Sequence, residues 1–530
     1  MAKVEKVAGP LKFGEGPAWS TDGRRIHYSI GHSHFVYDVE RARQVDDSLD
    51  AARRARGDTT AQRDTTQRTG GPAANPRGYQ PVETPILLRA KRDLPQGTAL
   101  LRGARIVTMK GDEVIERGDI LVRNNRIAAI GATGSVQAPA GTQTFDVSGK
   151  TIVPGFVDTH AHPDVERGEH QQPWSYLVNL AYGVTTMRDP QTGTTDVLTY
   201  EDAVDAGLAV GPRIYSTGPG LFGPTYFPGL GDDIKDVDHA RRIMRRYSQY
   251  YDTKTLKMYI TGNRQQRQWV LMAAREQNIM PTTEGALDFR YDLTMAIDGY
   301  PGQEHALPVT PLYKDVVGLF AQSGITYTPT LLVVYGGPWG ENYWYEHENV
   351  YNDPKLRRFT PYEELSAKSR RRVRGSFGGG NAGGWFMDDE YNFPAVAKAA
   401  ADIVKGGGRI GVGSHGQLNG LGYHWEMWSI AKGGMSPHDV LRCATIFGAE
   451  GIGLQRDLGS VEVGKLADLV ILDGNPLQDI RNTNTVRYVM KNGRLYDGNT
   501  LDELYPTRRT MDRVKGTPEK PDVKAGIAGQ

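Results

Sequence analysis

Apolar and polar residues alternate along several short stretches of the chain, a period typical of β-strands. The first stretch, residues 11–38, reads LKFGEGPAWSTDGRRIHYSIGHSHFVYD and alternates on both sides of a TDG turn. This pattern predicts a β-hairpin within residues 1–40. One hairpin buries little core by itself. Residues 41–85 break the alternation, because they are rich in charge and contain almost no large apolar side chains. We predict a charged, solvated linker there, part of which is compatible with a helix.

Alternation returns in two places that lie far apart in the chain. ALLRGARIVTM, DILVRNNRIAAIG and TQTFDVSGK precede a central region, and ADLVILDG and VRYVMKNGRLYDG follow it. Short β-branched runs separated by turn residues indicate a small sheet in each place. We therefore expect residues 86–150 and 460–500 to form one composite β-sandwich domain. Residues 501–530 are then a C-terminal tail.

Short strands alternate with helix-length segments over residues 151–459. Eight segments are strand candidates: IVPGFVDTH, GVTTMRD, RIYSTG, TLKMYIT, IMPTTEG, GQEHAL, TYTPTLLV and RIGVGSHG. Eight strands with helical segments between them predict an α/β fold, a (β/α)8 TIM-type barrel, in which the chemistry lies at the C-terminal ends of the strands.

A long insertion, residues 334–408, separates the seventh strand candidate from the eighth. We expect an insertion of this size on the active-site face to act as a lid or a substrate wall. Its aromatic cluster (Trp339, Tyr343, Trp344 and Tyr345) either contacts substrate or, more simply, forms the insertion's own core. The basic run SRRRVRG is by default a solvated face, and FGGGNAGG lacks the lysine and Ser/Thr of a phosphate loop.

Composition narrows the class of partner. The 530 residues are enough for more than one folding unit, and 63 Lys and Arg against 62 Asp and Glu give a formal charge of +1. A net charge this small does not favour binding to nucleic acid or to an anionic membrane, so we expect a small-molecule partner. The two flanking arms, QPVETPIL to LPQGT and the tail, are either docking segments of a homo-oligomer or disordered.

A single cysteine, Cys443, excludes an intrachain disulfide and a cysteine-based metal site. No apolar run reaches the roughly 18 residues of a membrane span. The segment MAKVEKVAG lacks the apolar core of a secretory signal. The compartment stays open between the cytoplasm and a trimmed, secreted or periplasmic form.

The segment VDTHAH places His160 and His162 two residues apart at the end of a predicted strand. Both side chains leave the strand on the same face, which suits two imidazole nitrogens on one cation. The motif alone fits hydrogen-bonded histidines at a strand end equally well. A second such pair, His32 and His34, lies in the hairpin with no further ligand in view, and we favour the structural role for it.

Ligand-capable side chains recur where later strands end. They are Lys257 in the fourth strand, Glu284 in the fifth, His305 in the sixth and His415 in the eighth. Polar residues that close otherwise apolar strands are what a metal-dependent barrel enzyme requires.

Several of these segments resemble the amidohydrolase superfamily in its imidazolonepropionase-like and prolidase-like branch. The likeness covers residues 97–500 and rests on ALLRGARIVTMKGDEVIERGDILVRNNRIAAIG, GKTIVPGFVDTHAH, GVTTMRD and LGSVEVGKLADLVILDGNPLQDI. The hairpin PAWSTDGRRIHYSIGHSHFVYD is similar to a single WD40-like blade of the TolB or tricorn type. A full propeller precedes the hydrolase in related architectures, so the hairpin would be the remnant of one.

The resemblance implies roles for the residues at the strand ends. His160 and His162 match the first-strand metal ligands, Lys257 matches a lysine that bridges two metals once CO2 has carboxylated it, and His305 matches the sixth-strand ligand. The implied cofactor is one or two divalent ions, foremost Zn2+. Two positions depart from the family pattern, because Glu284 stands near a usual histidine and His415 in place of a usual aspartate.

The implied activity is hydrolysis of an amide or other C–N bond by a metal-activated water. We expect His415 and Glu284 to be catalytic, with His415 taking the water proton and returning it to the leaving amine. Residues expected to support the ligands or to contact substrate are His424, Asp189 and Glu426. Cyclic amides, acylated amino acids and Xaa-Pro dipeptides are open as substrates. The alternatives are a scaffold protein that has lost catalytic competence, and lyase or isomerase chemistry on the same site.

Overall fold

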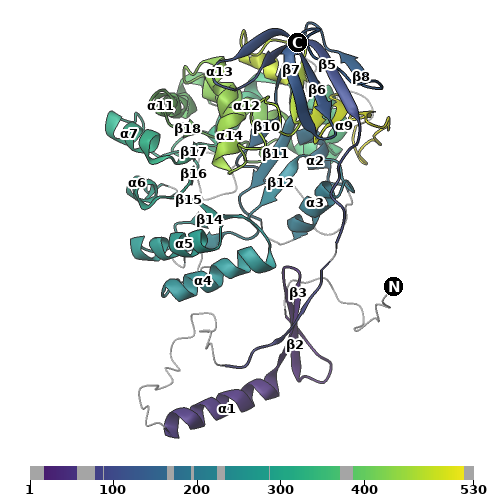
Figure 1. Ribbon diagram of the computed structural model, residues 1–530. Coiled ribbons are helices and arrows are strands. Elements are labelled where there is room, and N and C mark those ends of the chain that lie inside the picture. The colour runs from purple at the N-terminus through teal and green to yellow at the C-terminus, as the bar shows by residue number, and fades with distance from the viewer. Residues whose placement is uncertain are drawn as a thin grey trace.

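The computed structural model describes residues 17–55, 78–87, 89–163, 172–192, 196–223, 233–285, 287–369 and 386–518. Figure 1 shows a large sheet at the top, parallel strands flanked by helices in the middle and a small N-terminal sheet with one helix at the bottom. None of the helices among the described residues combines the length and apolar character that crossing a bilayer requires.

The N-terminal sheet has four antiparallel strands in chain order. They are β1 (Ala18–Trp19), β2 (Arg25–Ile30), β3 (Ser33–Asp38) and β4 (Val82–Pro85). Strands β2 and β3 form a hairpin where the alternation predicts one. The segment predicted to be a linker contains α1 (Val39–Ala55) and β4. The sheet contacts the central region where Phe35 packs edge-on against Tyr250, at 5.6 Å between ring centroids.

The large sheet joins both flanks of the chain. In spatial order its strands are β22 (Glu503–Tyr505), β21 (Arg494–Asp497), β20 (Val486–Lys491), β19 (Leu469–Leu472), β9 (Thr151–Pro154), β5 (Thr98–Val107), β6 (Val114–Arg123) and β7 (Arg126–Ala132), with β8 (Gln143–Asp146) beside β5. The antiparallel pairing of β9 with β19 connects the two flanks. A separate buried core that includes Leu101, Ile120, Ile471 and Met490 lies on one face of it. The two flanks thus share one sheet, while their arrangement as a β-sandwich stays a prediction.

The central region is built on parallel strands. They are β10 (Phe156–Asp158), β11 (Val184–Asp189), β12 (Arg213–Ser216), β13 (Leu221–Phe222), β14 (Thr255–Tyr259), β15 (Met280–Glu284), β16 (Gly302–Glu304), β17 (Thr326–Thr328) and β18 (Arg409–Ile410). Parallel pairs run from β10 to β12 and from β13 to β18 in chain order. A parallel bridge between Asp158 and Val412 links the first strand to the segment after the last. Each of the eight predicted strand segments contains at least one of these strands.

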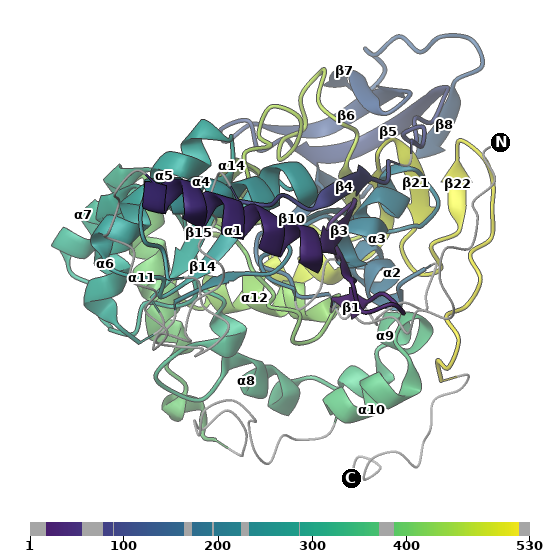
Figure 2. The ribbon, with the colours of Figure 1, turned by 90° about the horizontal axis from the view of Figure 1, so that it is seen from below.

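Helices cover the outer side of the parallel strands (Figure 2). They are α2 (Trp174–Ala181), α3 (Asp196–Asp205), α4 (Val237–Arg245), α5 (Arg264–Glu276), α6 (Phe289–Asp298), α7 (Lys314–Ser323), α11 (Phe393–Lys405), α12 (Leu421–Ala431), α13 (Pro437–Ala444) and α14 (Ile446–Gly451), with the π-helix η1 (Arg246–Tyr250) after α4. Local sequence sets their ends. The side chain of Asp288 caps the start of α6, and Gly299 in the left-handed region, at φ 93°, ends it.

The insertion before β18 is folded onto α12. It follows η2 (Leu331–Val333) and contains α8 (Gly340–His347), η3 (Val350–Asn352), α9 (Pro354–Phe359), α10 (Tyr362–Ser369) and η4 (Asp388–Glu390), together with α11. The indole of Trp344 donates to Ser429 Oγ at 2.8 Å and stacks on Trp425. Trp344 therefore packs against α12, whereas Tyr343 contacts Tyr391 and Phe393 within the insertion itself. Residues 370–385, which contain most of SRRRVRG and all of FGGGNAGG, lie outside the described residues.

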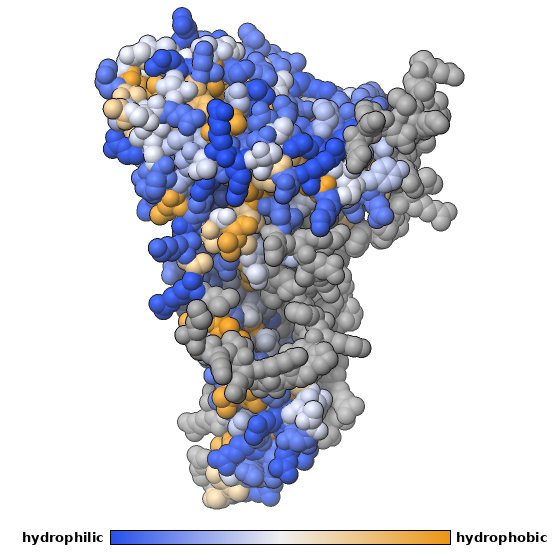
Figure 3. All heavy atoms as spheres, turned by 90° about the vertical axis from the view of Figure 1, so that its right-hand side faces the viewer, coloured by the Kyte–Doolittle hydropathy of each residue, from blue (hydrophilic) through white to orange (hydrophobic). Residues whose placement is uncertain are grey.

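The N-terminal sheet leaves large apolar side chains exposed, namely Trp19, Val82, Ile86 and Leu87. Figure 3 shows hydrophobic residues among hydrophilic ones on the narrow lower part of the molecule. The large sheet has a buried core of its own, whereas the N-terminal sheet does not enclose these residues.

Candidate functional site

Three histidines from different strand ends converge in the central region. His160 follows β10, His305 follows β16 and His415 follows β18, and one nitrogen of each lies within 4.8 Å of the others. The ring of His160 lies 4.7 Å from that of His305 and 5.1 Å from that of His415, between centroids. Because the strands are parallel, their C-terminal ends meet at one edge and bring these distant residues together.

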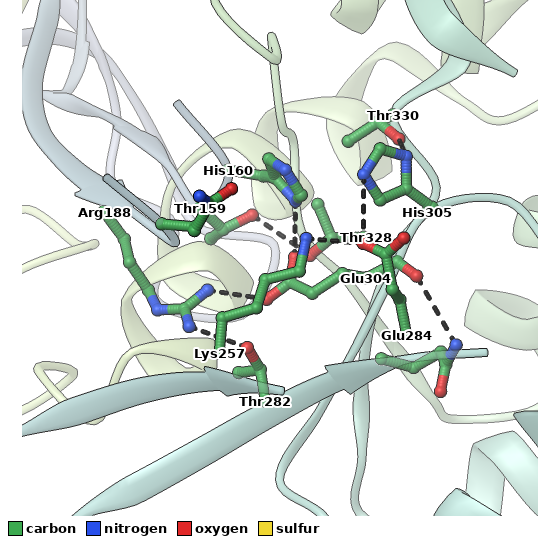
Figure 4. Close-up of polar contacts among 12 residues, drawn as sticks. Thr159, His160, Arg188, Lys257, Thr282, Glu284, Glu304, His305, Thr328 and Thr330 are labelled. Atoms are coloured by element: carbon green, nitrogen blue, oxygen red, sulfur yellow. Dashed lines mark hydrogen bonds and ion pairs between the residues drawn. The ribbon is translucent and has the colours of Figure 1, made fainter. Parts of the chain in front are cut away.

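Each of the three imidazoles has a partner on its Nδ1 atom. His160 Nδ1 lies 2.7 Å from Glu304 Oε2, and His305 Nδ1 lies 2.9 Å from Thr330 Oγ1, as Figure 4 shows. His415 Nδ1 lies 3.2 Å from Gln417 Oε1. A carboxylate only accepts, so His160 carries its proton on Nδ1 and leaves the lone pair of Nε2 free. Outer partners of this kind fix the tautomer and orientation of metal-binding histidines.

Burial keeps these imidazoles neutral. It lowers the pKa of His160, His305 and His415 well below the ordinary value, and the nearby cationic Lys257 lowers it further. A neutral imidazole offers a lone pair, whereas a protonated one repels cations. The cluster is therefore in the protonation state that a metal ion needs.

His162 lies at the rim of the cluster. Its Nε2 is 3.2 Å from His160 Nε2, and its Nδ1 is 3.4 Å from Asp189 Oδ1. Its side chain is 27% exposed, whereas that of His160 is fully buried. If Asp189 accepts the Nδ1 proton, the lone pairs of two neutral imidazoles face each other at 3.2 Å. That contact is repulsive unless a cation or a proton lies between them.

Lys257 and Glu284 form a buried ion pair beside the histidines. Lys257 Nζ lies 2.6 Å from Glu284 Oε2, and the same oxygen lies 3.4 Å from His305 Nε2. Neither Nζ nor Oε2 has a well-directed hydrogen bond to any described residue. Glu284 Oε1 accepts from Tyr335 Oη at 3.0 Å. A buried carboxylate oxygen without a hydrogen bond, next to three imidazoles, is an available ligand.

Beneath the histidines lies a buried pair of charges, Arg188 and Glu304. Arg188 Nη1 donates to Glu304 Oε1 at 2.6 Å, while its other nitrogens donate to Thr255 and Thr282. The guanidinium thus ties β11 to β14, β15 and β16, and holds the carboxylate that orients His160. The sequence interpretation missed this pair, although both residues lie at or next to the end of a strand and charged residues are seldom buried without a partner.

Glu304 lies on the same side of its strand as His305. Strand alternation predicts that Glu304 points to the opposite side from His305, yet both side chains reach the cluster. Alternation holds only while the backbone stays extended. His305 has φ 65°, so the strand ends at Glu304 and the chain turns. Thr330 at φ 45° and His415 at φ 58° are likewise left-handed. Such strained residues cluster at functional sites.

Two of the expected supporting residues lie away from the cluster. His424 is fully buried, with Nδ1 3.0 Å from Thr483 Oγ1 and Nε2 2.9 Å from Tyr182 O. Glu426 accepts the backbone N–H groups of Leu331 and Leu332 at 2.7 and 3.0 Å. It therefore reaches the site only through the turn after Thr330, the residue that contacts His305. Asp189 does approach the site, at His162.

Three neutral imidazole nitrogens and a neighbouring carboxylate are a donor set that suits a divalent transition-metal ion. The residues present thus fit the metal that the resemblance implies. His415, which the sequence suggests as a proton acceptor, belongs to the converging set of possible ligands.

A family model described as "Amidohydrolase family" matches residues 151–496, well over half of the chain. The chain belongs to the amidohydrolase family. The matched range begins with β9 and ends with β21, so it includes every member of the cluster.

Similar proteins in this family carry different names. An adenine deaminase from Chelativorans sp. (strain BNC1) is 23% identical over 464 residues, which are 82% of this chain and 65% of that protein. An imidazolonepropionase from Shouchella clausii (strain KSM-K16) is 39% identical over 79 residues, 14% of this chain and 18% of that protein. The first curated relative, an adenine deaminase from Deinococcus deserti, is matched over 13% of its length. The match to this chain thus covers less than two thirds of the length of each of these relatives.

The fold has solved counterparts. A Xaa-Pro dipeptidase with bound methionine superposes with a TM-score of 0.57 at 20% identity, covering 76% of this chain and all of that one. Phenylurea hydrolase B superposes with a TM-score of 0.57 at 19% identity, covering 76% and 97%. Identities this low show a shared fold.

Proposed function

We propose that this protein is a metal-dependent hydrolase that cleaves an amide or other C–N bond of a small molecule. One observation carries the proposal: three neutral imidazoles, two of them buried and that of His415 half-buried, are each held at Nδ1 and converge to within 4.8 Å. Membership in the amidohydrolase family supports the reaction class. The adenine deaminase and Xaa-Pro dipeptidase among its relatives are named for acting on C–N bonds.

His160, His305 and His415 would hold one divalent ion, foremost Zn2+, with Glu284 beside them. A bound divalent ion makes water a nucleophile near neutral pH and polarises a carbonyl. With His415 in the ligand set, the carboxylate of Glu284 is the group that takes the proton from water and passes it to the leaving amine. Tyr335 and Lys257 hold that carboxylate in place from two sides.

Carboxylation of Lys257, which would bridge a second ion, is less compatible with this arrangement. CO2 adds to a neutral amine. Burial alone would lower the pKa of Lys257, but the charges of Glu284, Tyr259 and Glu304 together raise it. A carbamate would also place a second negative charge against Glu284. We therefore favour one ion per chain.

Elemental mass spectrometry on protein purified without chelator tests the metal. We expect about one divalent ion per chain in the wild type and a loss in His160→Ala, while Lys257→Met keeps the ion. Two ions per chain that fall to one or none in Lys257→Met would establish the carboxylated, dinuclear site instead. Absence of metal would favour the scaffold alternative.

Activity is tested by the release of amine or ammonia from a cyclic amide, an N-acyl amino acid, a set of Xaa-Pro dipeptides and adenine. We expect turnover of at least one class, its loss on chelation and its return with Zn2+. A metal-loaded protein that converts a substrate without net addition of water would indicate lyase or isomerase chemistry.

Two features of the architecture extend the proposal. The order of the parallel pairs and the bridge between Asp158 and Val412 support a closed (β/α)8 barrel. The four antiparallel strands β1–β4 have the strand number and order of a propeller blade, which supports the blade-like interpretation of the N-terminus. Homo-oligomer formation and the cellular compartment stay predictions.

A further inference from the structure

A polar cavity of about 70 Å³ lies between the large sheet and the central region. Its walls come from three places: Asp93 of the segment before β5, Gly207 and its neighbours between α3 and β12, and Lys491, Arg494, Glu503 and Arg509 of β20 to β22 and the residues beyond. Liquid water takes about 30 Å³ per molecule, so the space suits two waters or one small ion such as phosphate or a carboxylate group.

Lys491 lines this cavity and is only 9% exposed. No hydrogen bond or ion pair to its ammonium is made by any residue in the part of the chain that the structure describes. A buried charge without a partner is costly, and the group then shifts its pKa. Burial, with a smaller contribution from nearby Arg213, lowers the pKa of Lys491 to about 8, although the carboxylates of Asp468, Asp205 and Asp93 act in the opposite direction.

The carboxylates around Lys491 already have other cations. Both oxygens of Asp93 accept from Arg494 at 2.7 Å, and Arg494 also donates to Glu503 at 2.6 Å. Asp468 is paired with Arg213 at 2.5 Å. Asp205 lies 3.3 Å from Arg92. Arg494 thus serves two carboxylates, and none of these four carboxylates lies within ion-pair distance of the Lys491 ammonium.

We propose that this cavity binds a small oxyanion, through the ammonium of Lys491 and the guanidinium of Arg509. Arg509 is free to turn toward it, because its side chain is 60% exposed and lies 3.9 Å from Glu503. The bound anion would supply the charge that Lys491 lacks. It would also join the sheet, the segment around Asp93 and the α3–β12 loop, and so stabilise the contact between the two halves of the protein.

This site is separate from the histidine cluster. Arg213, next to Lys491, begins β12, whereas the histidines follow the C-terminal ends of their strands. In a parallel arrangement these are opposite ends. The anion is therefore not the substrate of the proposed hydrolase, and the inference does not depend on that function.

Calorimetric titration with inorganic phosphate, in a buffer free of other oxyanions and with chloride at matched ionic strength, tests the proposal. We expect saturable binding of one phosphate per chain and a rise in Tm. Lys491→Met should weaken binding by about tenfold or more, the effect of losing a charge-assisted hydrogen bond. Lys110→Met, at an exposed lysine outside the cavity, should bind as the wild type does.

Two further variants separate the alternatives. His160→Ala removes a histidine from the cluster and should keep phosphate binding, whereas binding lost in that variant would place the phosphate at the metal centre and overturn the proposal. Arg509→Gln changes a largely exposed side chain and should weaken binding even if Lys491→Met fails to fold. Acetate in place of phosphate tells whether a carboxylate group suffices. No binding of either anion, or binding that both Lys491→Met and Arg509→Gln retain, rules the site out.

Discussion

Two histidine pairs of the same spacing, His32 with His34 and His160 with His162, lie in very different surroundings. His34 Nε2 lies 3.2 Å from His27 Nδ1 in the N-terminal hairpin, and His32 is exposed. His160 is fully buried at the end of a parallel strand, with two further imidazoles around it. The motif is the same, but only a set of parallel strands brings ligands from distant parts of the chain to one edge.

The difference teaches that burial and outer partners distinguish a site from a pair. Glu304 and Arg188 lie beneath His160 and fix its tautomer. In the hairpin, the ring of His34 only stacks on that of His27, at 5.4 Å between centroids. A hairpin that contacts little of the chain cannot exclude water from a charged centre, whereas the central region can.

The largest expected difference is between variants that each lack one histidine of a pair. His160→Ala should abolish metal binding and hydrolysis, because it deletes a ligand from a set of three. His34→Ala should change neither by more than about twofold. Metal content and amine release, measured on both variants in parallel, check this. Equal losses in the two would mean that the hairpin pair belongs to a metal site after all.

His424 is buried but belongs to neither pair, so it allows the effect of burial on stability to be measured apart from metal binding. Burial lowers the pKa of His424 to about 3, while an unfolded histidine titrates near about 6.5. Below pH 6.5 this histidine is protonated in the unfolded chain but not in the folded protein. The free energy of unfolding therefore falls as the pH decreases from 6.5 toward 3. The loss from this residue is on the order of 5 kcal/mol at the acid end. Urea denaturation of the metal-free protein measures this. The free energy of unfolding of His424→Gln should decline less steeply below pH 6.5 than that of the wild type, and equal slopes in the two proteins would contradict the prediction.

Glu304→Gln tests the outer partner of His160. The amide keeps the shape but presents a neutral group to His160 Nδ1 and to Arg188, leaving a buried guanidinium without its counter-charge. Loss of such a partner typically weakens metal affinity by about 10- to 100-fold. Zinc competition with a chelator measures this change. Glu83→Gln, which alters the carboxylate that accepts from Ser33 in the N-terminal sheet, is the matched control and should leave affinity unchanged.

Tyr335→Phe should have the smallest effect. It removes the donor to Glu284 at 3.0 Å but keeps the ring that stacks on His305 at 5.2 Å between centroids. Losing one hydrogen bond to a carboxylate corresponds to roughly 1.5–3 kcal/mol when fully buried and less at a site open to substrate. We expect kcat to fall by about tenfold at constant metal content. A change in metal content without a change in kcat would assign Tyr335 to metal retention.

The strands could be predicted from the sequence because apolar periodicity is local. The same pattern at ADLVILDG and at ALLRGARIVTM also indicated the shared sheet. Arg188, Glu304 and Tyr335 could not be placed, because their roles depend on contacts between residues far apart in the chain. The side of the strand on which Glu304 lies depends on a left-handed turn at His305, and no glycine or asparagine in QEHAL signals it. The role of His415 likewise follows from its distance to His160 and His305, which the residues next to it in the sequence do not indicate.

The pairing of β9 with β19 determines when the large sheet can be completed during translation. Val153 lies opposite Val470, so the sheet receives its last four strands only after the whole central region has been made. At about 5–20 residues per second, translation leaves the edge of β9 without its neighbour for tens of seconds. An unpaired, apolar strand edge is a site of aggregation during that time. The yield of native protein should therefore depend on how fast the ribosome delivers residues 460–505, and on chaperones that shield β9 until then.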